Sequence, residues 1–188
     1  MLYRIVTLTA LAVGGALLAK QMNKSRGAQA GSSIKEEIDV NVPVRVAYDQ
    51  FTQFEEFPRF MESVKEIKQL DDKRLHWRAS IMGKEIEWDA EITEQIPDSK
   101  IAWRSTSGTP NGGRVSFKSL SRARTRVTLE MYYEPQDGLE MAGDALGAVR
   151  AEARGNLKSF KEMIEVRGQE TGAWRGTITP QTELGTNR

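Results

Sequence analysis

The sequence predicts an α+β fold in which a curved, seven-stranded antiparallel sheet wraps around one long C-terminal helix, preceded by an N-terminal membrane helix. Three observations lead to this fold. Short segments with alternating apolar residues recur between residues 34 and 134, separated by brief polar turns. The hydrophobic period changes to 3.6 residues from Leu139 onward. An uncharged, mostly apolar run occupies residues 5–19.

The apolar run would span about 22 Å as a helix, against a hydrocarbon core of about 30 Å. Arg4 and Lys20 flank it, and their long side chains can carry the charges to the membrane surface. We therefore predict a transmembrane anchor over residues 1–20, followed by a flexible linker over residues 21–33 that is rich in Gly, Ala, Ser and Lys.

Three cations follow the run and one precedes it, so the positive-inside bias places the domain on the cytoplasmic side. The alternative is an exported protein with a cleaved signal peptide. Ala28-Gln29-Ala30 offers the small-x-small cleavage pattern that this alternative requires.

The folded domain is predicted over residues 34–167. Its first strand, residues 34–42, ends at Pro43, which suits the start of a helix over residues 44–53. Phe54, Phe57 and Phe60 recur at helical spacing around Pro58 and indicate a second short helix or turn. Alternation predicts six further strands, at residues 64–70, 75–82, 85–96, 100–106, 114–120 and 125–134.

A two-residue turn at Gly83-Lys84 would join the second and third of these six strands, with the glycine where φ must be positive. The apolar face of this hairpin would pair Ile81 with Ile86, Ala79 with Trp88, Trp77 with Ala90 and Leu75 with Ile92. The polar face would pair Ser80 with Glu87, Arg78 with Asp89 and His76 with Glu91. The sheet should therefore have one dry face and one solvated face.

The last element of the domain is one helix of about 28 residues that ends near Gly168. Its apolar face steps by three or four residues through Leu139, Gly143, Leu146, Val149, Ala153, Leu157, Phe160 and Ile164. The glycine-containing residues 168–188 are predicted as a disordered tail, in which the exposed pair Trp174-Arg175 hints at docking.

This order of elements is that of the helix-grip architecture, and residues 34–167 resemble the SRPBCC superfamily. That superfamily includes START lipid-transfer domains, the birch-pollen-allergen fold, coenzyme-Q-binding proteins and polyketide cyclase/dehydrase proteins. The segments that carry the resemblance are VPVRVAY at 42–48, FEEFPRFMESV at 54–64 and RTRVTL at 124–129. The resemblance implies a hydrophobic cavity between the sheet and the C-terminal helix.

Composition excludes several classes of chemistry. The chain has no cysteine, which removes disulfides, thiolate catalysis and cysteine metal sites. His76 is the only histidine and falls on the polar face of its strand, so a metal site is not expected. After residue 33 the chain carries 23 basic and 26 acidic side chains, a net charge of −3, which does not support nucleic-acid binding. We assign no catalytic residue and no cofactor.

The residues expected to line the cavity are the inward-facing apolar ones of the strands and the long helix: Trp77, Trp88, Trp103, Phe117, Met131, Leu146 and Val149. The competing interpretation is that they simply form the core. The function that follows is membrane-tethered binding or transport of a hydrophobic or amphipathic small molecule, such as a lipid or an isoprenoid quinone. Two alternatives are an enzyme of the polyketide cyclase/aromatase type and a ligand-free envelope or stress protein that acts through protein interactions.

Overall fold

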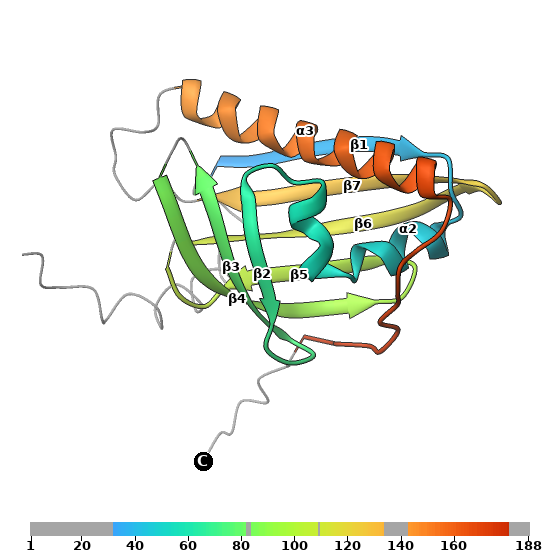
Figure 1. The fold of residues 1–188 in the computed structure, drawn as a ribbon, viewed down its shortest axis with the longest axis horizontal. Coiled ribbons are helices and arrows are strands. Elements are labelled where there is room, and N and C mark those ends of the chain that lie inside the picture. The colour runs from blue at the N-terminus through green and yellow to red at the C-terminus, as the bar shows by residue number, and fades with distance from the viewer. Residues whose placement is uncertain (1–31, 82–83, 109, 134–142, 181–188) are drawn as a thin grey trace, which may run out of the picture. The chain divides into compact units, whose positions relative to one another are not determined.

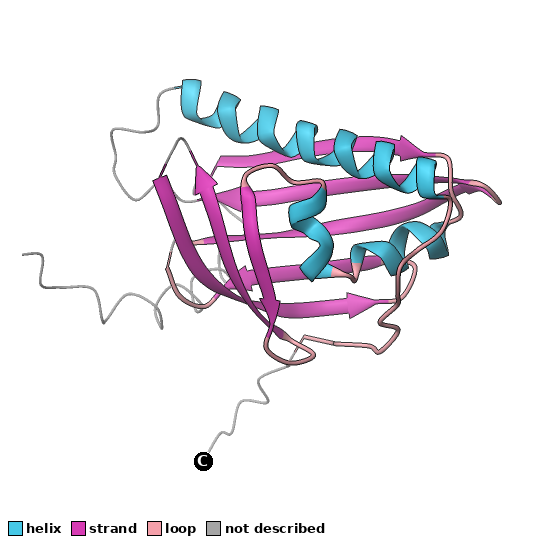
Figure 2. Ribbon diagram, viewed as in Figure 1, coloured by secondary structure: helices cyan, strands magenta, loops and turns pink. Residues whose placement is uncertain are grey.

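The computed structural model describes residues 32–81, 84–108, 110–133 and 143–180, and the compact unit of the chain begins at Ser32. Figures 1 and 2 show a curved sheet with the helices against one of its sides. In chain order the elements are β1 (Ser32–Val40), α2 (Val44–Phe51), the 3-10 helix η1 (Phe54–Arg59), β2 (Val64–Gln69), β3 (Arg74–Ile81), β4 (Lys84–Ile96), β5 (Lys100–Ser105), β6 (Asn111–Ser121), β7 (Arg124–Tyr133) and α3 (Gly143–Arg167).

The seven strands form one antiparallel sheet in the order β1-β7-β6-β5-β4-β3-β2. Strands β2 to β7 are sequential neighbours, as their short connections predict. Strand β1 does not pair with β2, because α2 and η1 lie between them in the chain and carry it to the opposite edge of the sheet. Strand β1 pairs instead with β7. The predicted seven-stranded antiparallel sheet with a C-terminal helix is confirmed.

The predicted register of the β3–β4 hairpin is wrong by two residues. Ile81 pairs with Lys84, so Trp77 lies opposite Trp88 and not opposite Ala90. A slip of two residues leaves every side chain on its predicted face, because side chains alternate with a period of two. On the polar face the observed pairs are Arg78 with Glu87 and His76 with Asp89, and these replace the predicted pairs. Met82 and Gly83, where the turn was predicted to begin, lie outside the described residues.

The dry, concave face of the sheet and the inner faces of the helices form one core. Tyr48, Ile101, Val115, Phe160 and Ile164 are all at most 1% exposed within it. Helix α2 and η1 contribute aromatic side chains to this core, which explains the helical spacing of phenylalanines around Pro58. The core is thus built by elements from both ends of the chain.

Helix α3 packs along β1 (Figure 1). Its predicted apolar face is the buried one. Ala153, Leu157, Phe160 and Ile164 are buried, and Val149 is partly buried. The helix is described from Gly143, whereas the prediction started it at Leu139, which falls in the undescribed residues 134–142. The helical period was therefore read correctly for the described part.

The prediction of a disordered tail from residue 168 is wrong for residues 168–180, which run from the end of α3 past α2 toward β4 (Figure 1, dark red). We call residues 168–180 the strap. Ile178 is 5% exposed and forms a β-bridge with Gln95, through two backbone hydrogen bonds of 2.8 and 2.9 Å. Trp174 and Arg175 also dock on the domain and are not a free pair. Residues 181–188 lie outside the described residues.

Among the described residues, no helix combines the length and apolar character needed to cross a membrane. The predicted anchor at residues 1–20 and the linker up to residue 31 lie outside the part of the chain that the structure describes.

Candidate functional site

A row of aromatic rings fills the space between α3 and the β3–β4 hairpin. It runs from Phe160 on α3 through Phe60 and Phe57 to Trp77 and Trp88, with successive ring centroids 5.6, 5.2, 6.0 and 5.5 Å apart. The inner rings are buried, since Phe160 is 0% exposed and Phe57 is 3% exposed. Trp77 and Trp88, at the outer end of the row, are only partly buried. The row therefore changes from core to accessible surface along its length.

A second group of inward-facing side chains lies on β5, β6 and β7. Trp103 pairs with Gly113, which in turn pairs with Met131. The Trp103 ring lies over Gly113, because a Cβ placed on that glycine would come within 2.8 Å of the ring. The glycine thus makes room for the indole. Trp103 and Met131 are partly buried and pack against the core.

These residues share one end of the sheet. Trp88 lies in the first half of β4, Trp77 lies opposite it in the middle of β3, and Trp103 lies in the second half of β5, so antiparallel pairing brings them toward the same side. Helix α3 begins at this end, where Val149 is partly buried. We call Trp77, Trp88, Trp103, Met131 and Val149 the half-buried cluster. At the opposite end, α2 and the second half of α3 seal the concave face.

Two of the predicted site residues do not belong to the half-buried cluster. Phe117 is 6% exposed and makes edge-to-face contacts with Tyr48 and Phe51, with centroids 5.6 Å apart in both pairs. It lies within the packed core. The side chain of Leu146 lies outside the described residues.

The neighbour predicted for Trp88 is wrong. The sequence paired it with Ala79, but Trp88 stacks on Trp77 at an interplanar angle of 14°. The other aromatic pairs of the described core meet at 55–80°. This nearly parallel stack is distinct from the edge-to-face and tilted packing of the other pairs.

The indole nitrogen of Trp77 is exceptional in its hydrogen bonding. Its Nε1 is the one buried side-chain nitrogen or oxygen of the described residues that has no hydrogen-bond partner. A buried donor left unpaired costs about 1–3 kcal/mol, and native structures contain few such groups. Sequence reasoning placed Trp77 on the dry face but gave no signal for its unpaired donor.

Two hollows on the described surface lie elsewhere, between α3 and the segment from η1 to β2. Their volumes are ≈ 440 and ≈ 460 Å³. They share Phe60, Glu62 and Ser159 in their walls, and none of the predicted site residues lines either one. Ser63 Oγ donates a hydrogen bond to Glu152, which lines one of the hollows, and this bond ties the segment to the first half of α3. Between α3 and the β3–β4 hairpin the structure places the aromatic row described above.

A polar network under the strap holds the sealed end of the domain. The carboxylate of Asp49, which is 0% exposed, accepts a hydrogen bond from Arg175 at 2.6 Å. Gln50 Oε1, also buried, accepts from the Thr171 backbone N–H at 3.0 Å and from Arg167 at 3.1 Å. Because buried polar groups require partners, these contacts make the strap part of the folded domain. Sequence analysis missed this network, although the Trp174-Arg175 pair was its visible sign.

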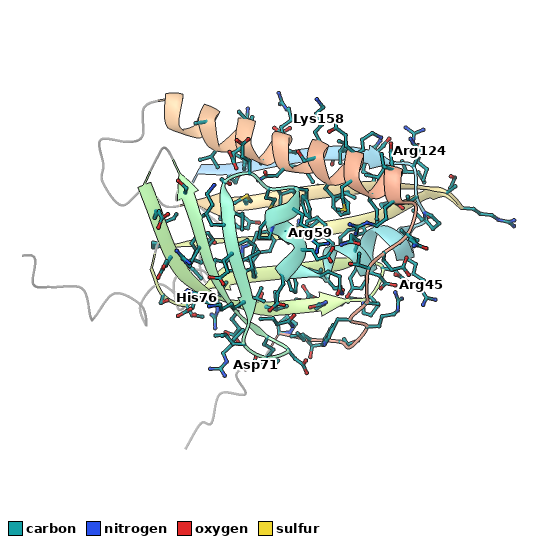
Figure 3. The ribbon with its side chains drawn as sticks, in the orientation of Figure 1. Arg45, Arg59, Asp71, His76, Arg124 and Lys158 are labelled. Carbon is teal, nitrogen blue, oxygen red and sulfur yellow. The ribbon has the colours of Figure 1, made fainter. Side chains whose placement is uncertain are left out.

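The titratable groups with shifted pKa values lie outside the half-buried cluster. Burial raises the pKa of the Tyr48 phenol, against an opposing hydrogen bond from Gln95 Nε2 at 3.1 Å. A hydrogen bond from His76 lowers the pKa of Asp89 on the convex face (His76, Figure 3). In the described part of the chain, no group of three or more His, Cys, Asp or Glu side chains is placed to hold a metal ion.

With this geometry the family can be assigned. Residues 40–162 match the family model described as "polyketide cyclase / dehydrase and lipid transport". The chain belongs to this family. It is also 47% identical, over 148 residues, to an uncharacterized 17.2 kDa protein of Streptomyces lincolnensis, a match that covers 78% of this chain and 99% of that protein.

Solved structures show the same fold. A START superfamily protein from Mycobacterium smegmatis has a TM-score of 0.59 at 16% identity, covering 72% of this chain and 95% of that one. The Zhui aromatase/cyclase from a Streptomyces species has a TM-score of 0.62 at 12% identity, covering 76% of this chain and 99% of that one. At these identities the likeness establishes the helix-grip fold alone. The match to the family model confirms the expected superfamily membership.

Proposed function

We propose that this protein binds a hydrophobic or amphipathic small molecule, such as a lipid or an isoprenoid quinone, at the half-buried cluster. The observation that carries the proposal is the contrast between the two ends of the concave face. Apolar inward-facing side chains are sealed at one end and remain partly exposed at the other. Covering exposed apolar surface is worth about 25 cal/mol per Å², so a ligand gains most at the half-buried end.

The ligand enters by displacing protein side chains and not by filling an empty chamber. An empty cavity of about 300 Å³ would cost about 7 kcal/mol, which is comparable to the whole stability of a domain. Filling the space with the outer rings of the aromatic row avoids that cost when no ligand is bound. Trp88, at the accessible end of the row, is the first ring that a ligand would displace.

Titration of the tryptophan fluorescence of the full-length chain with a long-chain quinone or a fatty acid tests the proposal. We expect saturable quenching or a spectral shift, with a negative heat-capacity change in calorimetry. Trp88→Ala should change ligand affinity more than it changes folding stability. Tyr132→Ala is the matched control, because Tyr132 follows Met131 on β7 but is 52% exposed on the other face.

Native mass spectrometry of protein extracted from its own membranes gives the independent readout. A co-purifying small molecule supports the proposal. If Trp88→Ala unfolds the domain and no small molecule co-purifies with the wild type, the tryptophans are core residues and the binding function is rejected.

A membrane anchor is the second part of the proposal. It rests on the uncharged apolar residues 5–19, with one cation before and three after them, and places the domain on the cytoplasmic side. Full-length protein should then fractionate with membranes and resist carbonate extraction. Mature protein that begins at Gly31 would instead demonstrate a cleaved signal peptide.

An enzyme of the aromatase/cyclase type is the alternative, and the family description favours it as much as it favours transport. Such an enzyme needs polar side chains to guide proton transfer near its substrate. The half-buried cluster consists of three tryptophans, a methionine and a valine, which favours binding. Chemical change of a co-purifying molecule on incubation with the protein would favour the enzyme.

A further inference from the structure

The two hollows between α3 and the segment from η1 to β2 take no part in the binding site proposed above. Their volumes are ≈ 440 and ≈ 460 Å³, and they adjoin, because Phe60, Glu62 and Ser159 line both. We call the two hollows together the α3 groove. No residue of the half-buried cluster lines the α3 groove, so its occupant is independent of the proposed small molecule.

The α3 wall of the groove is long and carries several small side chains. Its lining residues step by three or four along one flank of the helix, from Ala148 to Met163, over a length of about 22 Å. A Cβ placed on Gly155 would have no atom within 4 Å, so the space beside the helix is open there. Small side chains allow a second helix to approach closely. The small residues of this wall are Ala148, Ala151, Gly155 and Ser159.

Apolar side chains continue the lining where α3 faces the η1 segment. Pro58 and Met163 are half-buried, and Phe60 is buried with 8% of its surface exposed. All three line the first of the two hollows. An occupant of the groove therefore meets small or apolar side chains over most of the length of α3.

The charges of the groove are mainly negative. Glu62, Glu152 and Glu162 line it and are exposed. Arg59, the one cation among the described lining residues, forms an ion pair within η1. Glu162 pairs with Lys158 at 3.6 Å, whereas Glu62 and Glu152 form no salt bridge with any described residue. The complementary partner is therefore cationic.

We infer that the α3 groove binds a basic amphipathic helix of a partner protein. The apolar side of that helix packs on the small and apolar lining residues, and its lysines or arginines meet Glu62, Glu152 and Glu162. This arrangement is the helix-in-groove mode of peptide recognition. The glutamates would repel an anionic lipid surface, and a two-fold contact with a second copy of this chain would place the same carboxylates against each other.

A pair of synthetic peptides tests the charge complementarity. The first is a fluorescein-labelled peptide of about 15 residues, long enough as a helix to follow the α3 wall, with leucines at i, i+3, i+4 and i+7 and lysines on the other face. The second carries glutamate at every lysine position. In fluorescence anisotropy with the full-length protein, we expect saturable binding of the lysine peptide that weakens as ionic strength rises, and no binding of the glutamate peptide.

Two glycines of α3 provide a matched pair of variants. A Cβ on Gly147 or on Gly155 meets no atom within 4 Å, but only Gly155 lines the groove. Leucine at either position favours the helix, so both variants should fold. Gly155→Leu should weaken binding of the lysine peptide at least about 5-fold, because its side chain occupies the groove. Gly147→Leu should leave the affinity unchanged.

Substitution of single glutamates tests the contribution of the rim. Glu62→Gln should weaken binding of the lysine peptide about 2- to 5-fold, the effect of losing one exposed ion pair. Glu87→Gln is the control, because Glu87 lies on the polar face of the sheet, where it pairs with Arg78 at 3.0 Å. Its affinity should equal that of the wild type.

Chemical-shift mapping locates the peptide. We expect the amide signals of residues 58–63 and 148–163 to move on addition of the lysine peptide, and the indole signals of Trp88 and Trp103 to stay. Movement of the indole signals instead would place the peptide at the half-buried cluster and overturn the inference.

Three other results would also overturn the inference: failure of the lysine peptide to bind, equal binding of the two peptides, or wild-type affinity in Gly155→Leu. A wild-type dimer in sedimentation analysis that Gly155→Leu dissociates and Gly147→Leu does not would identify a second copy of this chain as the occupant, and would replace the partner helix. None of these results affects the small-molecule proposal, which the co-purification experiment tests separately.

Discussion

Replacing Arg175 by alanine tests whether the strap is part of the folded domain. Arg175 Nη1 donates to the buried Asp49 at 2.6 Å, and the same guanidinium contacts Asp98 at 2.7 and 3.1 Å. The Asp49 side chain is 0% exposed, whereas those of Arg175 and Asp98 are 33% and 37% exposed. The two ion pairs therefore contribute unequally to stability.

The expected magnitude follows from this difference. A hydrogen bond to a charged group contributes about 1.5–3 kcal/mol, and an exposed ion pair contributes about 0–1 kcal/mol. Loss of Arg175 leaves Asp49 with Arg45, at 3.3 Å, as its remaining ion-pair partner. We expect Arg175→Ala to lower the free energy of unfolding by about 2–3 kcal/mol, which corresponds to roughly 5–10 °C in Tm for a domain of this size.

Arg45→Ala is the matched control. Arg45 pairs with the same carboxylate, but its side chain is 66% exposed and points to solvent at the edge of α2 (Figure 3). Its loss should cost no more than about 1 kcal/mol. Thermal and urea unfolding of both variants, combined with Asp49→Asn in a double-mutant cycle, measure the coupling of each arginine to Asp49. Equal small losses for the two arginines would show that the strap is not docked and would refute this account.

Three further predictions concern single positions. Gly113→Ala should destabilise the domain by about 1–3 kcal/mol, because the added Cβ would meet the Glu130 carbonyl and the Trp103 ring. Gly155→Ala should instead stabilise α3 by up to about 1 kcal/mol, because no atom lies within 4 Å of the added Cβ. If urea unfolding ranks the two variants in the opposite order, the packing described at Trp103 is wrong. Phe160→Ala should cost about 3–5 kcal/mol in the same assay, since the ring is 0% exposed, and a loss below 1 kcal/mol would mean that α3 does not pack as described. The pKa of Asp71, at the turn after β2, is lowered from 3.8 to about 2 by hydrogen bonds from the Lys73 N–H, the Arg74 side chain and the Arg74 N–H (Figure 3). The ionised Asp71 carboxylate therefore stabilises the fold fully above pH 3.8, and this stabilisation is lost as the pH falls toward 2. The Tm difference between wild type and Asp71→Asn should disappear over this range, and a Tm difference that is independent of pH would contradict this account of Asp71.

Much of the fold could be read from local periodicity. The alternation at residues 75–81 and 86–92 specifies which side chains face the core, and the 3.6-residue period identifies the buried face of α3. Both patterns arise from the geometry of a single strand or helix, so each is complete within its own segment. Trp77, Trp88 and Trp103 could therefore be placed on the concave face before any contact was known.

The contacts between elements required the tertiary structure. Pairing Trp77 with Ala90 or with Trp88 gives the same alternation, so the sequence could not distinguish two registers that differ by two residues. The strap carries glycines and no periodic apolar pattern, and its order comes from Asp49, Gln50 and Gln95, which are 83 to 126 residues away in the chain from their strap partners. The aromatic row likewise joins η1, β3, β4 and α3. Local patterns determined which way side chains face, and only the packing of distant segments decided which of them meet.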